Sequence, residues 1–263
     1  NLAVIAQSLN YNEEAKLNYK FLISKKNNFK AMINLYLLYI DEVNYLEALK
    51  IIDILISKNI NIDTITKDKA FVLYKLKKYE ESINICKSYI KINNDINFLN
   101  ILGLNYLAKN DLEKSEKILK QALSLEKNNS VVLNSIGRMY HEKRDSINAE
   151  KYLLKAFKLN DSSYEIINNL AGFYREEGYY NKSIELYLKA LKLNPKNSTI
   201  INNLAKAYFD ISKLDLAEKY CVKALGLNKS DGNVQKILSL IYLRKHDFKN
   251  GWRFFDGRLN LSD

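Results

Sequence analysis

Few residues of this sequence have both the type and the spacing that catalysis or metal binding needs. Cysteine occurs only at Cys86 and Cys221, and histidine only at His141 and His246. A zinc site needs several such ligands at characteristic spacings, and these four residues are spread along the chain. No G-x-S-x-G, G-x-G-x-x-G, Walker or H-E-x-x-H motif is present. We therefore predict that the chain as given has no active site, no metal site and no cofactor.

Asparagine is the polar residue type whose spacing indicates a shared role. Two adjacent positions of a period of about 34 residues are often asparagine, at Asn34, Asn134, Asn168, Asn169, Asn202 and Asn203. A side-chain amide has a donor and an acceptor, so it can bind a peptide backbone without reading side chains. Arg138, Arg175 and Lys206 lie on neighbouring turns and are candidates for binding acidic groups of the same ligand. The alternative is composition alone, because Asn, Lys and Ile are abundant throughout.

A repeat supplies the elements that must position these side chains. Small residues recur every 33 or 34 positions, at Ala15, Ala48, Ser82, Ser115, Ala149, Ser183, Ala217 and Gly251. In one repeat, Ile201, Leu204 and Tyr208 follow the spacing of one helix face, and apolar residues of 214–225 continue it on a second helix. The short break between the two helices suits an antiparallel pair. One proline and eight glycines are too few for an all-β fold. The sequence predicts an all-α chain.

The repeat resembles the tetratricopeptide repeat. Leu102-Gly103-Leu104-Asn105-Tyr106, followed by Ser115, Leu119 and Ala122, matches its L-G-x2-Y pattern and the small and aliphatic residues that follow. The resemblance spans the chain and is poorer before about residue 95. It implies a right-handed α-solenoid of about eight antiparallel helix pairs in a single array without an internal boundary. The expected repeats are 1–28, 29–62, 63–95, 96–129, 130–163, 164–197, 198–231 and 232–263. Because the first repeat is short, we expect the chain to be a fragment or to lack its beginning.

In such a solenoid the first helix of each pair lines the inner, concave surface. Asn169-Leu170-Ala171 and Asn203-Leu204-Ala205 are similar there to the asparagine ladder of O-GlcNAc transferases, whose amides clamp an extended peptide. This resemblance implies a peptide groove with Asn34, Asn134, Asn168, Asn169, Asn202, Asn203, Arg138, Arg175 and Lys206 as contacts. The pattern does not match the Lys/Asn/Arg carboxylate clamp of chaperone-binding tetratricopeptide domains.

The last repeat differs from the others. Gly251, Trp252, Phe255, Asp256 and Arg258 resemble the G-W-x2-[YF]-[ED]-x-R ending found where a bacterial tetratricopeptide array runs into a glycosyltransferase domain. The alternative is a terminal helix that caps the core, although a cap normally has a polar outer face. We expect these residues to form an interface, either with a downstream domain or through self-association of the C-terminal repeat.

Charge and hydropathy narrow the choice of partner. The net charge is +11, but many lysines lie opposite the apolar stripe of the second helices, and no Arg-rich run is present. Nucleic acid is therefore an unlikely partner. No segment has 18 uninterrupted apolar residues, which argues against a membrane span, and no signal peptide is visible at the start of the chain. We expect a cytoplasmic protein.

The leading functional prediction is a non-enzymatic scaffold for protein–protein interaction that binds an extended peptide or partner protein in the concave groove. One alternative is the substrate-docking arm of a glycosyltransferase whose catalytic domain lies beyond residue 263. A weaker alternative is an assembly scaffold whose convex lysine face meets a nucleic acid or an anionic membrane.

Overall fold

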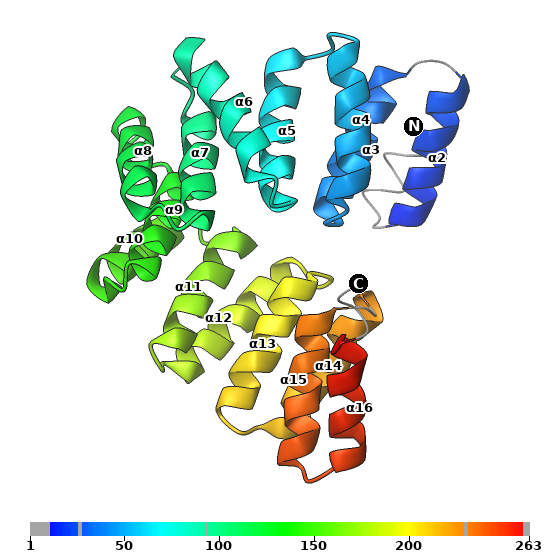
Figure 1. The fold of residues 1–263 in the computed structure, drawn as a ribbon, viewed down its shortest axis with the longest axis vertical. Coiled ribbons are helices and arrows are strands. Elements are labelled where there is room, and N and C mark those ends of the chain that lie inside the picture. The colour runs from blue at the N-terminus through cyan, green and yellow to red at the C-terminus, as the bar shows by residue number, and fades with distance from the viewer. Residues whose placement is uncertain (1–10, 26–27, 93, 229–230, 260–263) are drawn as a thin grey trace. The chain divides into compact units, whose positions relative to one another are not determined.

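The computed structural model describes residues 11–25, 28–92, 94–228 and 231–259, and every regular element in this part of the chain is an α-helix. The all-α solenoid predicted from the repeat is confirmed (Figure 1). The first helix of the first predicted repeat lies outside the described residues. Among the described residues up to 127, the helices are α2 (Asn12–Lys25), α3 (Phe29–Asp41), α4 (Tyr45–Ser57), α5 (Ile62–Lys75), α6 (Tyr79–Ile92), α7 (Ile96–Ala108) and α8 (Leu112–Leu125).

The described helices after residue 127 continue the series of paired helices. They are α9 (Ser130–Glu142), α10 (Ser146–Leu159), α11 (Tyr164–Glu176), α12 (Tyr180–Leu193), α13 (Ser198–Asp210), α14 (Leu214–Leu227), α15 (Gly232–Arg244) and α16 (Phe248–Leu259). The chain divides into two compact units, Asn1–Lys127 (unit 1) and Asn128–Asp263 (unit 2), close to the predicted repeat boundary at 129. A single array without an internal boundary stays a prediction. Across the described ranges, none of the helices has the length and apolar character needed to cross a bilayer.

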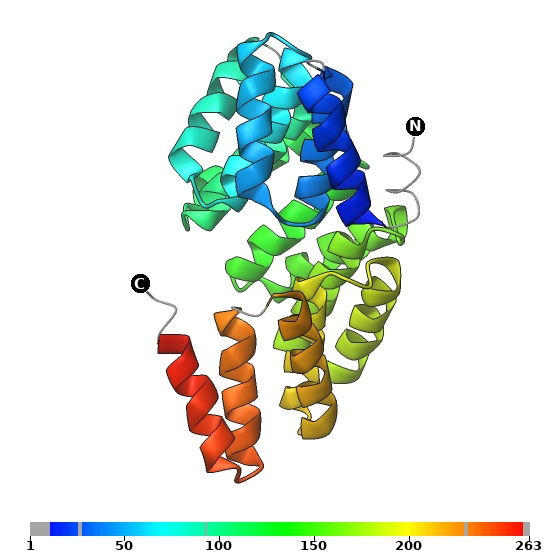
Figure 2. The same cartoon turned by 90° about the vertical axis from the view of Figure 1, so that its right-hand side faces the viewer.

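Each helix packs against the one before it and the one after it within its unit (Figures 1 and 2). Odd-numbered helices are the first helices of the repeats, and even-numbered helices are the second helices. First helices of neighbouring repeats also touch, as α5 with α7 and α9 with α11. The core of each unit lies between the two helix layers and consists of the predicted apolar columns, including Leu170, Ala171 and Leu204.

The turns inside the repeats explain how a chain with so few glycines forms tight helix pairs. After each first helix one residue adopts a left-handed conformation, at Val43, Lys77, Asn110, Arg144, Gly178, Ser212 and His246. In the last repeat the N–H of His246 donates to the carbonyl of Leu243, and the next N–H, of Asp247, donates to Tyr242 at 2.9 Å. These bonds satisfy the last carbonyls of the helix. Helix starts are capped by side chains such as Asp95, which accepts from two backbone N–H groups of α7.

The two helices of a repeat approach most closely at a small residue of the first helix. A Cβ placed on Gly137 would lie 2.6 Å from Leu153 Cγ, and one on Gly103 would lie 2.6 Å from Leu119. Where the first helix has alanine instead, at Ala205, the second helix has the smaller Cys221 in the same core cluster. Both cysteines are buried and free, and burial raises the pKa of Cys221 to about 12. Ala171 shares that cluster with the larger Tyr187, so a small first-helix residue leaves room for second-helix partners of different size.

Tyrosine recurs at one position of the first helices of unit 2, at Tyr140, Tyr174, Tyr208 and Tyr242, and we call this the tyrosine column; two of its members bond to the preceding repeat. Tyr174 donates its hydroxyl to Glu150 at 2.9 Å, and Tyr242 donates to Glu218 at 2.7 Å. Burial, together with the bonded carboxylate, raises the pKa of each of these tyrosines to about 12. Both phenols therefore stay protonated in the folded chain at pH values where an unfolded tyrosine ionises.

Gly137→Ala tests the close helix contact. The added methyl must displace Leu153, which is 1% exposed, so we expect a loss of about 1–3 kcal/mol from overpacking. This loss outweighs the gain of up to about 1 kcal/mol from the higher helix propensity of alanine. The measurement is the free energy of unfolding in urea. Adding Leu153→Cys, which copies the Ala205 and Cys221 pair, should recover part of the loss.

Gly226→Ala in α14 is the matched control, because no atom lies within 4 Å of its added Cβ. We expect this variant to be stabilised by up to about 1 kcal/mol. Equal effects at Gly137 and Gly226 would contradict the packing argument.

The tyrosine column predicts a specific loss of stability in alkali. A tyrosine whose pKa is raised by folding stabilises the folded chain fully at pH values below its unfolded pKa near 10. This stabilisation is lost as the pH rises towards the folded-state pKa of about 12. Tyr174→Phe with Tyr242→Phe should lower stability at pH 8, because two carboxylates lose their donor, and should flatten the decline above pH 10. Urea unfolding measured between pH 8 and 12 checks this, with Tyr180→Phe at an exposed position as the control. An unchanged alkaline slope in the double variant would show that other groups determine it.

Candidate functional site

The first helices of unit 2 present a row of polar side chains that bond from one repeat to the next. Asn169 on α11 donates its amide to Asn134 on α9 at 3.1 Å, and Asn203 on α13 donates to Asn168 on α11 at 3.1 Å. The structure therefore brings four of the predicted asparagines together in two pairs. We call Asn134, Asn169, Asn168 and Asn203 the asparagine ladder. Each donor amide keeps one N–H and its carbonyl, and each acceptor amide keeps its NH₂ group.

The asparagines differ in how accessible they are. Asn168, Asn169 and Asn203 are half-buried, whereas Asn134 and Asn202 are each only 8% exposed. Within the described part of unit 2, Asn202 Oδ1 is buried without a hydrogen-bond partner, and the residue 35 positions later is Ile237 rather than an amide. The ladder thus ends at α13. The open contact positions among the predicted asparagines of unit 2 are Asn168, Asn169 and Asn203.

The predicted cations lie beside the ladder in a setting of mixed charge. Arg175 Nη1 is 3.1 Å from Asp210 Oδ2 on the next first helix, so this guanidinium already has a carboxylate partner. Burial lowers the pKa of Lys206, and the charge of Arg175 lowers it further. Considering only described residues, neither Lys206 nor Arg138 forms an ion pair. These two cations are therefore better placed than Arg175 to accept an acidic group.

Further contacts extend the same face towards the ends of the first helices. His141 Nε2 lies 3.3 Å from Glu176 Oε2, and Arg244 donates to the carbonyl of Phe209 at 3.3 Å while its guanidinium lies 4.6 Å from the ring of that residue. These pairs, like the ladder, join residues 35 positions apart. We call the surface made by α9, α11, α13 and α15 the first-helix face of unit 2. That this face forms a concave groove stays a prediction.

Asn34 belongs to unit 1 and has a different environment. The hydroxyl of Tyr19 hydrogen-bonds with Asn34, and burial raises the pKa of that tyrosine. In the next repeat, Asp68 stands at the position equivalent to Asn169 and accepts a hydrogen bond from Tyr36 at 3.0 Å. Burial also raises the pKa of Asp68. Unit 1 thus uses tyrosine bonds where unit 2 uses paired amides, and Asn34 is not part of the ladder.

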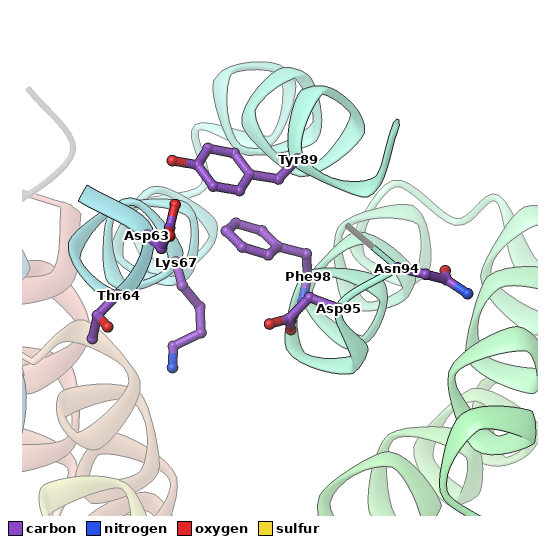
Figure 3. A pocket seen from close by; sticks show the side chains of 7 residues that line it. All are labelled: Asp63, Thr64, Lys67, Tyr89, Asn94, Asp95 and Phe98. Carbon is purple, nitrogen blue, oxygen red and sulfur yellow. Dashed lines mark hydrogen bonds between the residues drawn. The ribbon is translucent and has the colours of Figure 1, made fainter. Parts of the chain in front are cut away.

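Unit 1 contains a pocket of about 390 Å³ that sequence reasoning missed (Figure 3). It is lined by Asp63, Thr64, Lys67, Tyr89, Asn94, Asp95 and Phe98. The rings of Tyr89 and Phe98 stack with centroids 4.6 Å apart, and Figure 3 shows Lys67 and Asp63 extending from α5 opposite Phe98. The lining comes from α5, α6, α7 and the turn before α7, so no single sequence column reveals it. The one available signal is that Lys67 stands at the position equivalent to Asn134.

The predicted C-terminal interface is described in part. Gly251 is buried, and a Cβ there would lie 2.7 Å from Leu243 Cδ2, so this glycine lets α16 approach α15. Trp252 is 53% exposed and meets Phe255 edge to face with ring centroids 5.6 Å apart. The side chains of Asp256 and Arg258 lie outside the described residues. Where the structure describes side chains, no cluster of three or more His, Cys, Asp or Glu residues is arranged to hold a metal ion.

Comparison with solved structures relates this architecture to repeat proteins. A tetratricopeptide repeat protein from Parabacteroides merdae is 15% identical with a TM-score of 0.60, covering 90% of this chain and 94% of that one. A thermophilic repeat protein from Thermus thermophilus is 18% identical with a TM-score of 0.62, covering 68% and 97%. The human IFIT1 dimer with m7Gppp-AAAA is 17% identical with a TM-score of 0.68, covering 98% and 66%. At these identities the likeness shows the fold alone.

Comparison with protein families assigns the repeat itself. A family described as "Tetratricopeptide repeat" matches residues 96–129, 131–163 and 198–231, and one described as "TPR repeat" matches residues 173–211. No curated protein matches the sequence. The first two matches agree closely with the predicted repeats 96–129 and 130–163, and the third is the predicted repeat 198–231. The chain therefore contains tetratricopeptide repeats, an architecture typical of protein–protein interaction.

Proposed function

We propose that the first-helix face of unit 2 binds an extended peptide segment of a partner protein. The observation that supports this most directly is the asparagine ladder, with its two amide pairs at 3.1 Å on three consecutive first helices. Successive amides along such a face suit the regular donors and acceptors of an extended backbone. Binding through backbone groups tolerates many side-chain sequences.

The pairing of the amides matters as much as their presence. An unpaired asparagine loses rotamer freedom when it binds a ligand, whereas Asn169 and Asn203 are already held by Asn134 and Asn168. The bonds also leave free donors and acceptors on half-buried residues, where competition from water is reduced. The ladder is therefore preorganised to accept a peptide backbone.

Nearby charge gives the face a preference among peptides. Lys206 is half-buried beside Arg175, and its pKa is lowered first by burial and then by repulsion from the Arg175 cation. An acidic group of a ligand would relieve this repulsion. Asp210 and Asp231 offset part of it, so we expect a preference for one acidic side chain rather than for a strongly acidic segment.

The glycosyltransferase-arm alternative rests on two sequence resemblances, that of the asparagine ladder and that of residues 251–258. None of the families and structures compared above supports it. The nucleotide in the IFIT1 structure belongs to that protein.

Removing the ladder should weaken peptide binding without unfolding the chain. Peptides selected from an unbiased library against the intact chain would be measured by fluorescence anisotropy. We expect Asn169→Ala and Asn203→Ala each to cost about 0.5–1.5 kcal/mol of binding free energy, since each removes one amide. Asn233→Ala on α15, an exposed position, is the matched control and should bind as the wild type does. Wild-type affinity in the double variant Asn169→Ala, Asn203→Ala, with unchanged helical circular dichroism, would refute the ladder as the contact surface.

The cation beside the ladder predicts a pH effect of definite sign. Because the pKa of Lys206 lies below its ordinary value of 10.5, the ammonium loses its proton earlier as the pH rises. The affinity for a selected peptide with one Glu should therefore fall as the pH rises, starting at a lower pH than for a lysine of ordinary pKa, and Lys206→Met should bind more weakly and show a flatter profile.

A peptide with Gln in place of that Glu provides the control, and its affinity should depend little on pH or salt. Identical pH profiles for the Glu and Gln peptides would remove Lys206 from the proposal.

A further inference from the structure

The last helix of unit 2 exposes a face that its counterparts cover. Within unit 2, α10 packs on α9 and α11, α12 packs on α11 and α13, and α14 packs on α13 and α15. Among the described helices of the unit, α16 packs on α15 alone (Figure 2). On α16, Phe248 is 55% exposed and Trp252 is 53% exposed. We call the surface of Phe248, Lys249, Trp252 and Arg253 the end face.

The residues 34 positions earlier in the chain indicate what the end face would contact, because they occupy the same positions of the preceding repeat. Trp252 stands 34 residues after Glu218, and Lys249 stands 34 residues after Asp215. On α14, Glu218 accepts from Tyr242 at 2.7 Å and from Lys245 at 2.6 Å, and Asp215 also lies 2.6 Å from Lys245. Both acidic residues thus bond to the following first helix, α15.

The same contact occurs two repeats earlier in the unit. Glu150 on α10 stands at the position of Glu218 and accepts a bond from Tyr174 of the following first helix. Positions equivalent to Trp252 therefore meet the next helix at two other junctions. The end face is the corresponding surface of α16, on which a lysine and a tryptophan replace the two acidic residues of α14.

That change in chemistry selects the occupant. Where α14 offers Asp215 and Glu218 to the cation Lys245, α16 offers Lys249 and Trp252. If two copies of this chain met through their end faces, Lys249 and Arg253 of one copy would lie against Lys249 and Arg253 of the other. The chain as a whole also carries a net charge of +11. Like charges in apposition disfavour that pairing. An acidic residue facing Lys249 is favoured instead.

We propose that the end face binds an amphipathic helix of a partner protein, seated as a following first helix would be. The partner helix carries an apolar or aromatic residue over Trp252, in the place of Tyr242, and an acidic residue three positions later that pairs with Lys249, in the place of Lys245. An exposed tryptophan flanked by arginine and lysine is the kind of anchor that dominates helix recognition. This surface is separate from the asparagine ladder and does not depend on it.

Trp252 is the only tryptophan of the chain, so its emission reports directly on this face. The probe is a stapled helical peptide that copies residues 231–246, contains no tryptophan and carries Lys245→Glu; the staple offsets the weak helicity of short peptides. The control peptide keeps lysine at that position. Titrated into the intact chain, the Lys245→Glu peptide should shift Trp252 emission to shorter wavelength and bind at least about tenfold more tightly than the control, as expected for a favourable in place of an unfavourable charge pair.

A charge swap makes the test decisive. In the chain variant Lys249→Glu the preference should reverse towards the lysine peptide. In Trp252→Ala, binding measured by anisotropy of labelled peptide should be lost, while the helical circular dichroism stays that of the wild type as evidence of folding.

Three results would overturn the proposal. The first is no emission shift with either peptide up to about 1 mM, which corresponds to about −4 kcal/mol, or the same peptide preference in the wild type and in Lys249→Glu. The second is concentration-dependent dimerisation that buries Trp252, which would identify a second copy as the occupant. The third is a longer natural form of the chain in which Trp252 is already buried and both peptides fail to bind, which would assign the face to the chain's own continuation.

Discussion

The close approach of two antiparallel helices within each repeat is the contact on which the rest of the structure depends. It is made at two positions 16 residues apart, and in unit 2 the first-helix residue of the pair is small, at Gly137, Ala171, Ala205 and Ser239. Its partner on the second helix differs in size, from Cys221 and Leu153 to the larger Tyr187. Serine at the neighbouring small position adds a bond across the same gap, since Ser183 donates to the carbonyl of Ala171 at 2.7 Å.

Once each helix pair has a fixed spacing, the first helices lie close enough for their polar side chains to bond in series. The repeat is about 34 residues long, but these bonds join residues 35 apart, as in Asn134 with Asn169 and Arg175 with Asp210. The extra residue reflects the offset between side chains that face each other on neighbouring helices. The asparagine ladder is thus a consequence of the helix spacing, and the small residues of the core position groups that lie on the surface.

Much of this arrangement could be predicted from the sequence, because it depends on patterns that repeat. The helix pairs, the buried cysteine columns and the tight position at Gly137 all follow from apolar spacing and residue size. The amide pairs did not follow, because alignment at the repeat length puts Asn168 with Asn134 and Asn203 with Asn169, whereas the bonds cross between these columns. The partner of Arg175 was missed for the same reason, and the pocket at Lys67 and Phe98 was missed because several helices and a turn contribute to it.

The same contact positions carry different chemistry in different repeats, and this is where the repeats acquire separate roles. The position of Asn169 is aspartate at Asp68, which accepts a tyrosine hydroxyl instead of extending an amide ladder. The position of Glu218, which bonds to the following helix, is tryptophan at Trp252, exposed to more than half of its area. Substitutions at these positions leave the helix spacing intact, because that spacing is set by other residues. A repeat can therefore change what it contacts without changing how it folds, so the residues that distinguish one repeat from the next determine which groups that repeat contacts.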